Sequence, residues 1–315
     1  MKVLAADFGG TTIKVGVMEG SRILSRLQIP ARADRPMNER LGAVTGEWKR
    51  MLKEMRCELS DCAGAGLALP FLTATGGTRV MGQFGKFPGA AEIDYSEWSR
   101  TTLGIPVALE NDLRVALLGE WSAGAARGAS DVVMIALGTG IGCAAICDGG
   151  LLRGGNNRAA TLFGHISVDI GGERARCGNI GCAEDLASTA TLPERARQHP
   201  DFKQSLLADG KSIDYERVFK LASAGDRCSE KLVAHSLRVW SALALNAVVA
   251  YDPAMLVLGG GVAREDSVLE SIRRHIAEYT PGMRWQVPVV RAELGDDAAL
   301  LGCERLVLSA REHLP

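Results

Sequence analysis

Short apolar runs that suit strands alternate along the chain with longer stretches in which apolar residues recur at helical spacing. Lys2 to Asp7 and Ile13 to Val17 predict two strands, joined as a hairpin by the glycine-rich turn Phe8 to Thr12. Pro36 to Leu59 carries apolar residues at every third or fourth position, which predicts a helix. The pattern then predicts strands at Ala65 to Pro70 and Val107 to Glu110, and a helix at Leu113 to Ala123.

The second half opens with the same arrangement of strand, glycine turn and strand. Val132 to Leu137 and Cys143 to Cys147 flank the turn Gly138 to Gly142, roughly 130 residues after the first hairpin. Such a repeat predicts two related domains, with a boundary near residues 118–130. We place the first domain at residues 1–118 together with a C-terminal helix at about 297–312, and the second domain at residues 119–296.

Further helices and one strand are predicted in the rest of the second half. Met255 to Leu258 is a strand that runs into three glycines, Gly259 to Gly261. Asp296 and Asp297 are expected to cap a last helix that runs through Leu308. The helices in between are predicted at Asp214 to Ala224, Ser229 to Tyr251 and Asp266 to Tyr279. Because helices and strands alternate, the chain belongs to the α/β class.

Composition and charge narrow the range of functions. The 315 residues suit two domains, and 36 Lys+Arg against 37 Asp+Glu leave no basic excess for nucleic-acid binding. The few apolar residues before Asp7 are too short for a secretory signal, and the apolar stretches 132–147 and 241–251 are too short to span a bilayer. We therefore expect a cytoplasmic protein with no membrane role, in which the eight cysteines stay reduced.

Two glycine-rich turns have the composition of phosphate-binding loops. In the first, Asp7 stands at a strand end before Gly9 to Thr12, so backbone N–H groups and hydroxyls can approach a phosphate while Asp7 faces its metal ion. A plain hairpin turn is the alternative interpretation of each motif. The chain has neither a P-loop nor a Gly-x-Gly-x-x-Gly helix start, and Gly259 to Gly261 could receive an adenosine at a strand end.

Glu110, Asn111 and Asp112 end a predicted strand and precede a predicted helix. Asn111 or Asp112 could cap that helix, which is a common role of these residue types. A carboxylate at the carboxyl end of a strand also fits catalysis, because α/β proteins bind their ligands at that edge of the sheet. The motif by itself leaves both interpretations open.

In their order along the chain, these motifs resemble those of the ROK family, which comprises repressors, uncharacterised reading frames and sugar kinases. The resemblance runs through most of the chain. It implies a two-domain actin-like ATPase fold of the ribonuclease H-like type, with a cleft between a small and a larger domain and the last helix packed on the small one. The matching segments are Asp7 to Lys14, Glu110 to Asp112, the second hairpin with Gly149 and Gly150, Gly164 with His165, Cys177 to Glu184, and Leu258 to Val262.

This resemblance implies an ATP-dependent sugar kinase. Asp112 would be the general base that takes the proton of a sugar hydroxyl, usually the one on C6, as that hydroxyl attacks the γ-phosphorus. Asn111 would hold ring hydroxyls, and Asp7 would orient Mg²⁺ through water. The residues implied in ATP binding are Asp7, Gly9, Gly10, Thr11, Thr12, Lys14, Gly138, Thr139, Gly140, Gly260 and Gly261.

A structural zinc ion is implied as well. Three of the family's four ligands are matched by His165, Cys177 and Cys182. Ala175 stands where many members have the fourth ligand, a cysteine. Because structural zinc prefers four ligands, either a water, Asp169 or Glu173 completes the site, or no metal binds and the cysteines are buried thiols. The imidazole of His165 would contact the sugar with one nitrogen and the metal with the other.

At the sugar-binding positions the chain departs from the family. Leu162 replaces a glutamate that contacts hydroxyls on the C1/C2 side of the ring, and losing a charged hydrogen-bond partner costs roughly 1.5–3 kcal/mol. We therefore expect a substrate other than simple glucose, one that is deoxygenated, substituted or differently configured there. Glu184 is retained and would bind the anomeric side. Phe71 and Lys86 replace a glycine and an asparagine on the sugar side. Arg114 replaces an asparagine and is interpreted as a helix-face residue, with a phosphate or product contact as the alternative.

The favoured function is an ATP-dependent sugar kinase, because the whole transfer machinery is present. The alternative is a catalytically degenerate sugar sensor, motivated by Leu162, Ala175 and Phe71. Repressors of the family carry a helix-turn-helix segment before the first hairpin, where this chain has six residues, so DNA binding is not expected. By analogy with the family, we expect a homodimer that takes a small sugar as its substrate.

Overall fold

The computed structural model describes residues 1–75, 77–82, 85–279 and 286–312. The chain divides into two compact units of nearly equal length. Unit 1 consists of Met1–Gly128, Leu151–Ala159 and Glu293–Pro315, and unit 2 consists of Ala129–Gly150 and Ala160–Ala292. The sequence analysis ended the first segment of this domain at residue 118. In the structure that segment continues to Gly128, and unit 1 also includes the short segment 151–159.

Unit 1 is built on a five-stranded sheet with the strand order β3-β2-β1-β4-β7. β1 (Lys2–Phe8) pairs antiparallel with β2 (Thr12–Met18), and β2 pairs antiparallel with β3 (Ile23–Pro30), which confirms the predicted first hairpin. On its other side, β1 pairs in parallel with β4 (Cys62–Leu69), and β4 pairs in parallel with β7 (Val107–Asn111). The carboxyl ends of β1, β4 and β7 therefore meet at one edge of the sheet.

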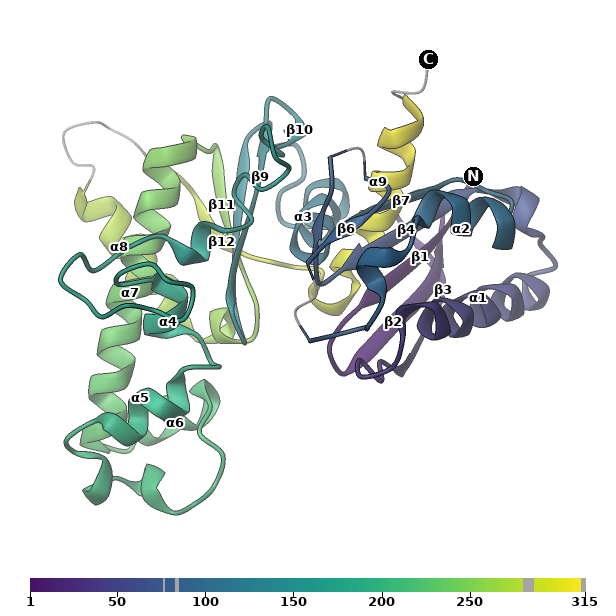
Figure 1. Ribbon diagram of the computed structural model, residues 1–315. Coiled ribbons are helices and arrows are strands. Elements are labelled where there is room, and N and C mark those ends of the chain that lie inside the picture. The colour runs from purple at the N-terminus through teal and green to yellow at the C-terminus, as the bar shows by residue number, and fades with distance from the viewer. Residues whose placement is uncertain (76, 83–84, 280–285, 313–315) are drawn as a thin grey trace. The chain divides into compact units, whose positions relative to one another are not determined.

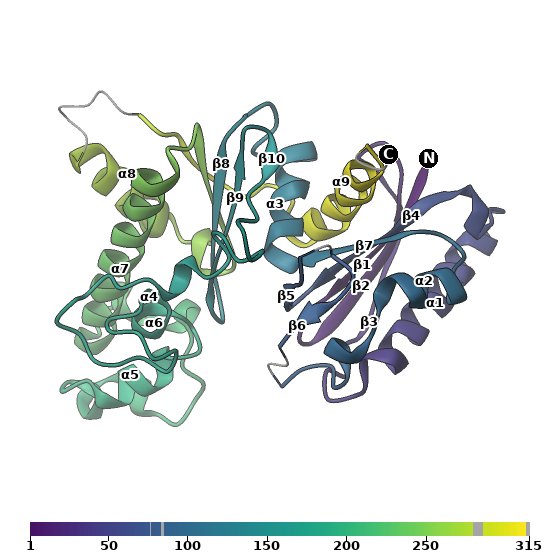
Figure 2. The same cartoon turned by 45° about the horizontal axis from the view of Figure 1, so that its top comes forward.

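Helices cover both faces of this sheet, as Figure 1 and Figure 2 show for unit 1. α1 (Met37–Glu54) packs its apolar side against one face, and the indole N–H of Trp48 donates to the carbonyl of Ala5 at 3.2 Å. α9 (Ala298–Glu312) covers the other face, where Gly66 of β4 leaves room for Cys303. The remaining elements of unit 1 include β5 (Leu72–Thr73), β6 (Val80–Met81), α2 (Tyr95–Thr102) and α3 (Asp112–Ala123).

Glycines let α3 and α9 cross at very short range. A Cβ on Gly302 would lie 1.8 Å from the carbonyl oxygen of Val115, and one on Gly119 would lie 2.0 Å from the carbonyl oxygen of Ala298. No side chain fits at either position unless the helices separate. The residues that begin α3 are therefore held by a helix from the far end of the chain.

Unit 2 repeats the same sheet plan. Its five strands have the order β10-β9-β8-β11-β12. β8 pairs antiparallel with β9 and parallel with β11, and β11 pairs parallel with β12. In order and direction, these four strands match β2, β1, β4 and β7 of unit 1. The bounds are β8 (Val132–Leu137), β9 (Ile141–Cys147), β10 (Gly150–Leu151), β11 (Met255–Gly259) and β12 (Val289–Arg291). This repetition agrees with the internal duplication predicted from the two glycine turns.

The helices of unit 2 are α4 (Ala183–Ala187), α5 (Leu192–Gln198), α6 (Tyr215–Ser223), α7 (Arg227–Tyr251) and α8 (Asp266–Tyr279). The sequence analysis considered only the apolar stretch 241–251 as a membrane span, but α7 is longer and begins at Arg227. By length and composition alone, this helix could cross a membrane. However, 56% of its most apolar window is buried inside the structure, which is the pattern of a core helix.

Candidate functional site

The first glycine turn lies at the carboxyl edge of the sheet in unit 1. Gly9 cannot carry a side chain, because a Cβ there would lie 2.8 Å from the carbonyl oxygen of Thr12. The Oδ2 atom of Asp7 lies 3.3 Å from the Nζ atom of Lys14, which is also 3.1 Å from the Oδ1 atom of Asp296. Burial raises the pKa of Asp7, and the ammonium of Lys14 lowers it. A single carboxylate beside backbone N–H groups fits Mg²⁺, which keeps most of its waters and takes its remaining ligands from phosphates.

The carboxylates expected to cap the last helix make ion pairs. Asp296 and Asp297 lie in the short 3₁₀ turn Gly295–Asp297 before α9. Asp296 pairs with Lys14, and Asp297 pairs with Arg26. These pairs connect the start of α9 to β2 and β3, close to the first glycine turn.

Asp112 is the first residue of α3, and Asn111 before it caps the helix. The Oδ1 atom of Asn111 accepts hydrogen bonds from the backbone N–H groups of Leu113 and Arg114 at 3.2 and 3.4 Å. The Nδ2 group of Asn111 donates to the carbonyl of Phe71 at 3.4 Å and to the Oδ1 atom of Asp112 at 3.0 Å. The same Oδ1 atom accepts from the N–H of Leu113 at 2.8 Å. Within the described residues, the Oδ2 atom of Asp112 has no hydrogen bond.

The surroundings of Asp112 favour its protonated form. The pKa of this half-buried carboxyl is raised from 3.8 to about 6, mainly by burial and then by the nearby carboxylate of Asp7. The hydrogen bond from Leu113 and the ammonium of Lys86 act in the opposite direction. A carboxyl group with this pKa is ionised at neutral pH yet holds a proton more readily than ordinary aspartate, which suits a general base.

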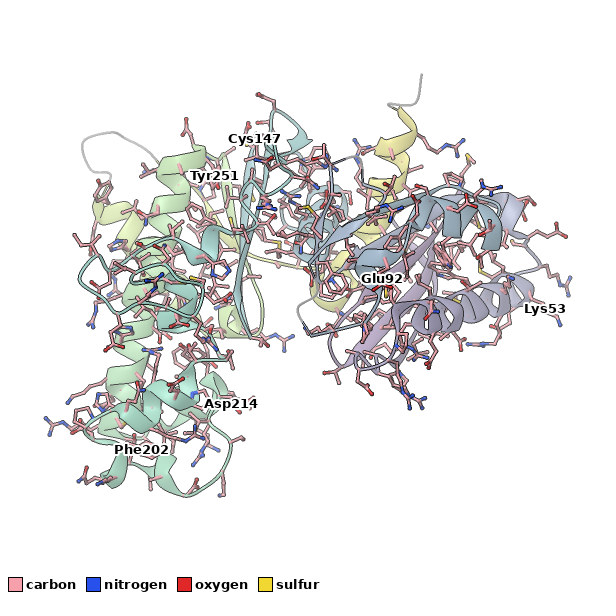
Figure 3. The ribbon with its side chains drawn as sticks, viewed as in Figure 1. Lys53, Glu92, Cys147, Phe202, Asp214 and Tyr251 are labelled. Carbon is pink, nitrogen blue, oxygen red and sulfur yellow. The ribbon has the colours of Figure 1, made fainter. Side chains whose placement is uncertain are left out.

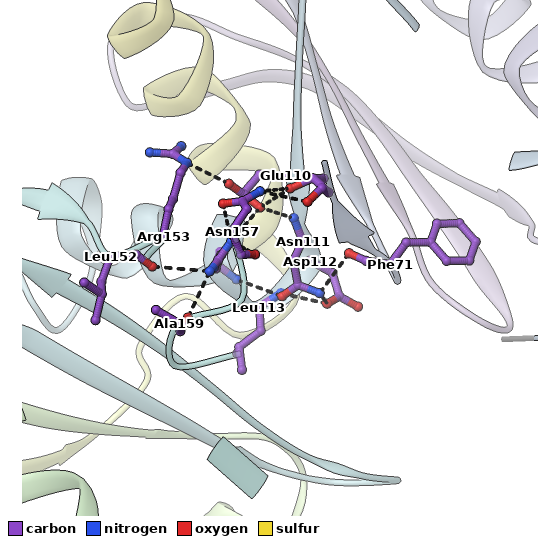
Figure 4. A network of polar contacts seen from close by, with 11 residues as sticks. Phe71, Glu110, Asn111, Asp112, Leu113, Leu152, Arg153, Asn157 and Ala159 are labelled. Carbon is purple, nitrogen blue, oxygen red and sulfur yellow. Dashed lines mark hydrogen bonds and ion pairs between the residues drawn. The ribbon is translucent and has the colours of Figure 1, made fainter. Parts of the chain in front are cut away.

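A buried polar network lies behind Asp112 (Figure 4). Glu110, at the end of β7, is 2% exposed. It accepts hydrogen bonds from the hydroxyl of Thr73 at 2.8 Å, the N–H of Asn111 at 2.9 Å and the Nε group of Arg153 at 3.1 Å. Because Glu110 binds the backbone of Asn111, the network fixes the point at which the strand turns into α3.

Arg114 is a buried cationic partner of Glu110, in addition to Arg153, so its interpretation as a helix-face residue is wrong. Its side chain is 1% exposed, and its Nη1 atom lies 3.2 Å from the Oε1 atom of Glu110. The guanidinium also donates to the Oδ1 atom of Asn157 at 3.0 Å and to the carbonyls of Leu152 and Ala159 at 3.3 and 2.9 Å. Arg114 thereby holds the segment 151–159 on unit 1. Figure 4 labels Leu152, Arg153, Asn157 and Ala159 of this segment. The only sequence signal for this contact was the spacing of four residues between Glu110 and Arg114.

In unit 2, the carboxylate of Glu184 accepts a hydrogen bond from the second glycine turn. The N–H of Gly138 donates to the carbonyl of Gly140 at 3.0 Å, and Thr139 is exposed at the tip. The Oε2 atom of Glu184 accepts a hydrogen bond from the N–H of Ile141 at 2.8 Å and would lie 2.5 Å from a Cβ on Gly140. A side chain at position 140 would therefore push the carboxylate of Glu184 away from the turn.

The three-glycine segment after β11 lies beside this second turn. Gly260 has a positive φ of 86°, and a Cβ on it would lie 2.2 Å from the carbonyl oxygen of Leu137. Leu137 is the last residue of β8, which leads directly into the second turn. Gly261 has open space around it. Both glycine segments of unit 2 therefore lie at the carboxyl edge of one sheet, where nucleotides bind in open α/β folds.

His165, Cys177 and Cys182 come together as the sequence predicts for a metal site. Their ligand atoms lie within 4.8 Å of one another. Within the described part of the chain, no fourth His, Cys, Asp or Glu joins this group, and the carboxylate of Asp169 accepts from the N–H of Gly171 at 3.0 Å. Two thiols and an imidazole form a soft donor set that fits zinc and leaves one coordination position to a ligand from outside the protein.

Leu162 and His165 lie on one short turn. The N–H of His165 donates to the carbonyl of Leu162 at 2.9 Å, and the side chain of Leu162 is 42% exposed. The ring of Phe163 packs on Tyr251, with ring centroids 5.4 Å apart. Figure 3 labels Tyr251, which lies at the end of α7. The Nδ1 atom of His165 lies 3.9 Å from the Oε1 atom of Glu184. The structure thus brings the predicted sugar-binding residues of unit 2 into one region.

Comparisons with known proteins point to one family across nearly the whole chain. A model of the ROK family matches residues 3–310. A glucokinase of Halalkalibacterium halodurans is 30% identical over 316 residues, which cover 95% of this chain and 92% of that protein. A beta-glucoside kinase of Klebsiella pneumoniae is 30% identical over 306 residues, which cover 96% of this chain and 94% of that protein.

Solved structures give the same result. A ROK hexokinase from Thermus thermophilus superposes with a TM-score of 0.85 at 30% identity, covering 99% of this chain and 100% of that one. A ROK family glucokinase from Streptomyces griseus, in complex with glucose and AMPPNP, superposes with a TM-score of 0.74 at 28% identity, covering 98% and 100%. These neighbours confirm the predicted actin-like ATPase fold.

Proposed function

The chain belongs to the ROK family and is an ATP-dependent sugar kinase, and we propose that Asp112 is the general base of its reaction. The observation that carries this proposal is the placement of one half-buried carboxyl, with a pKa of about 6, at the sheet edge that also holds the first glycine turn. The acceptor is a hydroxyl of the sugar, and we propose the one on C6.

The contacts of Asp112 assign a role to each of its oxygens. The Oδ1 atom accepts two hydrogen bonds, from Asn111 and Leu113, and these fix the carboxylate plane. The Oδ2 atom is left to take the proton of the sugar hydroxyl. The Glu110 network keeps the backbone of Asn111 in place, so the base is oriented before any substrate binds.

We propose that the glycine turns hold the phosphates of ATP. In unit 1 these are Gly9, Gly10, Thr11 and Thr12 with Lys14, and in unit 2 they are Gly138, Thr139 and Gly140, with Gly260 and Gly261 at the adenosine. Asp7 would orient Mg²⁺ through water, and the ion would offset phosphate charge during transfer. His165, Cys177 and Cys182 would hold zinc with a water as the fourth ligand, and the ion would fix the tautomer of His165.

The substrate is proposed to differ from free glucose on its C1/C2 side. We assign Asn111, His165 and Glu184 to its hydroxyls, and Leu162 to an apolar or missing substituent. The half-exposed Leu162 side chain offers no hydrogen bond, and a polar hydroxyl facing it would lose a partner. The similarity to both a glucokinase and a beta-glucoside kinase supports a hexose scaffold with variation at C1. A cytoplasmic location stays a prediction from the sequence, and a homodimer stays a prediction from the family.

The test is ADP release from ATP and Mg²⁺ with a panel of aldoses, β-glucosides, amino sugars, N-acetyl sugars, deoxy sugars and ketoses. Activity that disappears in Asp112→Asn and persists in Asp34→Asn, an exposed carboxylate on the same unit, supports the proposal. Leu162→Glu should improve the use of glucose relative to the best substrate. If no sugar of the panel causes ADP release and the protein still binds a sugar, the alternative of a catalytically degenerate sugar sensor is favoured.

A further inference from the structure

Lys86 brings a positive charge to the first glycine turn. It lies on the segment between β6 and α2, and its side chain extends to Gly10. A Cβ on Gly10 would lie 3.3 Å from the Nζ atom and 3.6 Å from the Cε atom of Lys86. The lysine therefore reaches the turn because residue 10 has no side chain. Its charge also acts on Asp112, whose pKa it lowers.

Among the residues that the structure describes, none forms an ion pair with Lys86. Lys14, the other lysine at this turn, forms ion pairs with Asp7 and Asp296. Lys86 is exposed, and across residues 1–75, 77–82, 85–279 and 286–312 it has neither an ion pair nor a hydrogen bond from its side chain. An unpaired ammonium between a glycine turn and a general base is available to an anion that arrives with the substrates.

The backbone next to Lys86 is fixed by aromatic packing. The buried ring of Phe87 packs edge-on against Phe8, which follows Asp7, and against Phe71, with ring centroids 5.7 and 6.4 Å apart. The N–H of Phe87 donates to the carbonyl of Ala33 at 2.6 Å. Phe71 is also the residue whose carbonyl accepts from Asn111. The same three rings thus position the turn, the lysine and the base relative to one another.

We propose that Lys86 binds the γ-phosphoryl group as it passes from ATP to the sugar, a role that rests on the proposed kinase function. In that step the sugar oxygen forms a bond to the γ-phosphorus, and the bond from the γ-phosphorus to the bridging oxygen breaks, with its electron pair going to ADP. The hydroxyl proton goes to Asp112. Lys86 keeps its own proton and binds the peripheral oxygens of the phosphoryl group, on which charge is spread in the transition state.

A negatively charged substituent on the sugar would also attract the ammonium of Lys86. The experiment therefore distinguishes this charge from that of the γ-phosphoryl group. Lys86→Met, Lys86→Arg and the parent are assayed with the best neutral sugar of the panel and with a hexuronic acid. Lys49→Met, an exposed lysine on α1 of the same unit, is the matched control. Thermal unfolding of each variant establishes that it is folded. ATP and ADP binding are also measured without sugar.

With the neutral sugar, kcat is expected to fall on the order of 100-fold in Lys86→Met, as for other single donors to a developing charge. Lys86→Arg should recover most of this loss, and Lys49→Met should match the parent. An unchanged kcat in Lys86→Met would overturn the proposal, as would a loss confined to the hexuronic acid. If the parent phosphorylates no sugar, the kinase function fails by itself. The ratio of ATP affinity to ADP affinity then tests the role of Lys86 by itself. If Lys86 contacts the γ-phosphoryl group, this ratio is lower in Lys86→Met than in the parent, and an unchanged ratio overturns the proposal.

Discussion

Replacing Asp112 by asparagine is expected to remove phosphorylation and, at neutral pH, to stabilise the fold. Both effects follow from the burial of one carboxyl group. The ionised form of Asp112 is the form that accepts a proton, but it lies in surroundings that favour the neutral form. Asparagine is neutral at every pH, and its Oδ1 atom can still accept the hydrogen bond from Leu113.

The size of the effect follows from the pKa. Folding raises the pKa of Asp112 from 3.8 to about 6. Because one pKa unit corresponds to about 1.4 kcal/mol, ionisation of Asp112 lowers the free energy of unfolding of the parent by about 3 kcal/mol. The contribution of the protonated carboxyl is fully present below about pH 4 and is lost as the pH rises through about 6. Asp112→Asn avoids this loss.

The assay is urea unfolding of the parent, Asp112→Asn and Asp34→Asn between about pH 4 and about pH 8. The stability advantage of Asp112→Asn should grow from near zero to about 3 kcal/mol across this range and level off above about pH 6. Over the same range kcat/KM of the parent should rise, while Asp34→Asn should behave as the parent throughout. A stability difference that does not change with pH, or a variant less stable than the parent at about pH 8, would refute the reasoning.

Three further outcomes are expected. Arg114→Met should cost about 3–5 kcal/mol in urea unfolding, because Glu110 loses its buried cationic partner and keeps only Arg153, whose side chain is 48% exposed. The added change Glu110→Gln should recover part of this cost. Gly302→Ala should cost about 1–3 kcal/mol through its clash with α3, whereas Gly42→Ala, with open space around it, should not destabilise; equal costs would contradict the packing. Ala175→Cys should retain about one zinc ion per chain after dialysis against a chelator, at least as much as the parent, and a variant that retains none would count against a metal role for this loop.

Local patterns were sufficient where one segment forms its own structure. The first hairpin needs only strand residues and a glycine turn, and Asp266–Tyr279 is a helix with the bounds that its periodicity predicts. β3 (Ile23–Pro30) alternates between more and less exposed residues, yet it was not predicted, because a half-exposed edge strand carries a weak apolar signal. The helix expected over Pro36 to Leu59 ends at Glu54.

Contacts between distant segments were outside the reach of the sequence. Arg114 has the composition of a helix surface residue, and only the pairing with Glu110 and Asn157 explains its burial. Lys86 was recognised as a departure from the family pattern. Its approach to Gly10 depends on how the Phe87 ring packs, and no spacing along the chain encodes that packing.

The route of the chain through the two units has a consequence for biosynthesis. The strands of the first sheet leave the ribosome early, but α9, which covers one face of that sheet, is made only after the whole of unit 2. During synthesis this apolar face is bare, and such a surface binds chaperones or aggregates until it is covered. A premature stop shortly before Ala298 would leave unit 2 intact and unit 1 uncovered. Loss of the last fifteen helical residues should therefore mark the protein for degradation as surely as a stop near the middle of the gene.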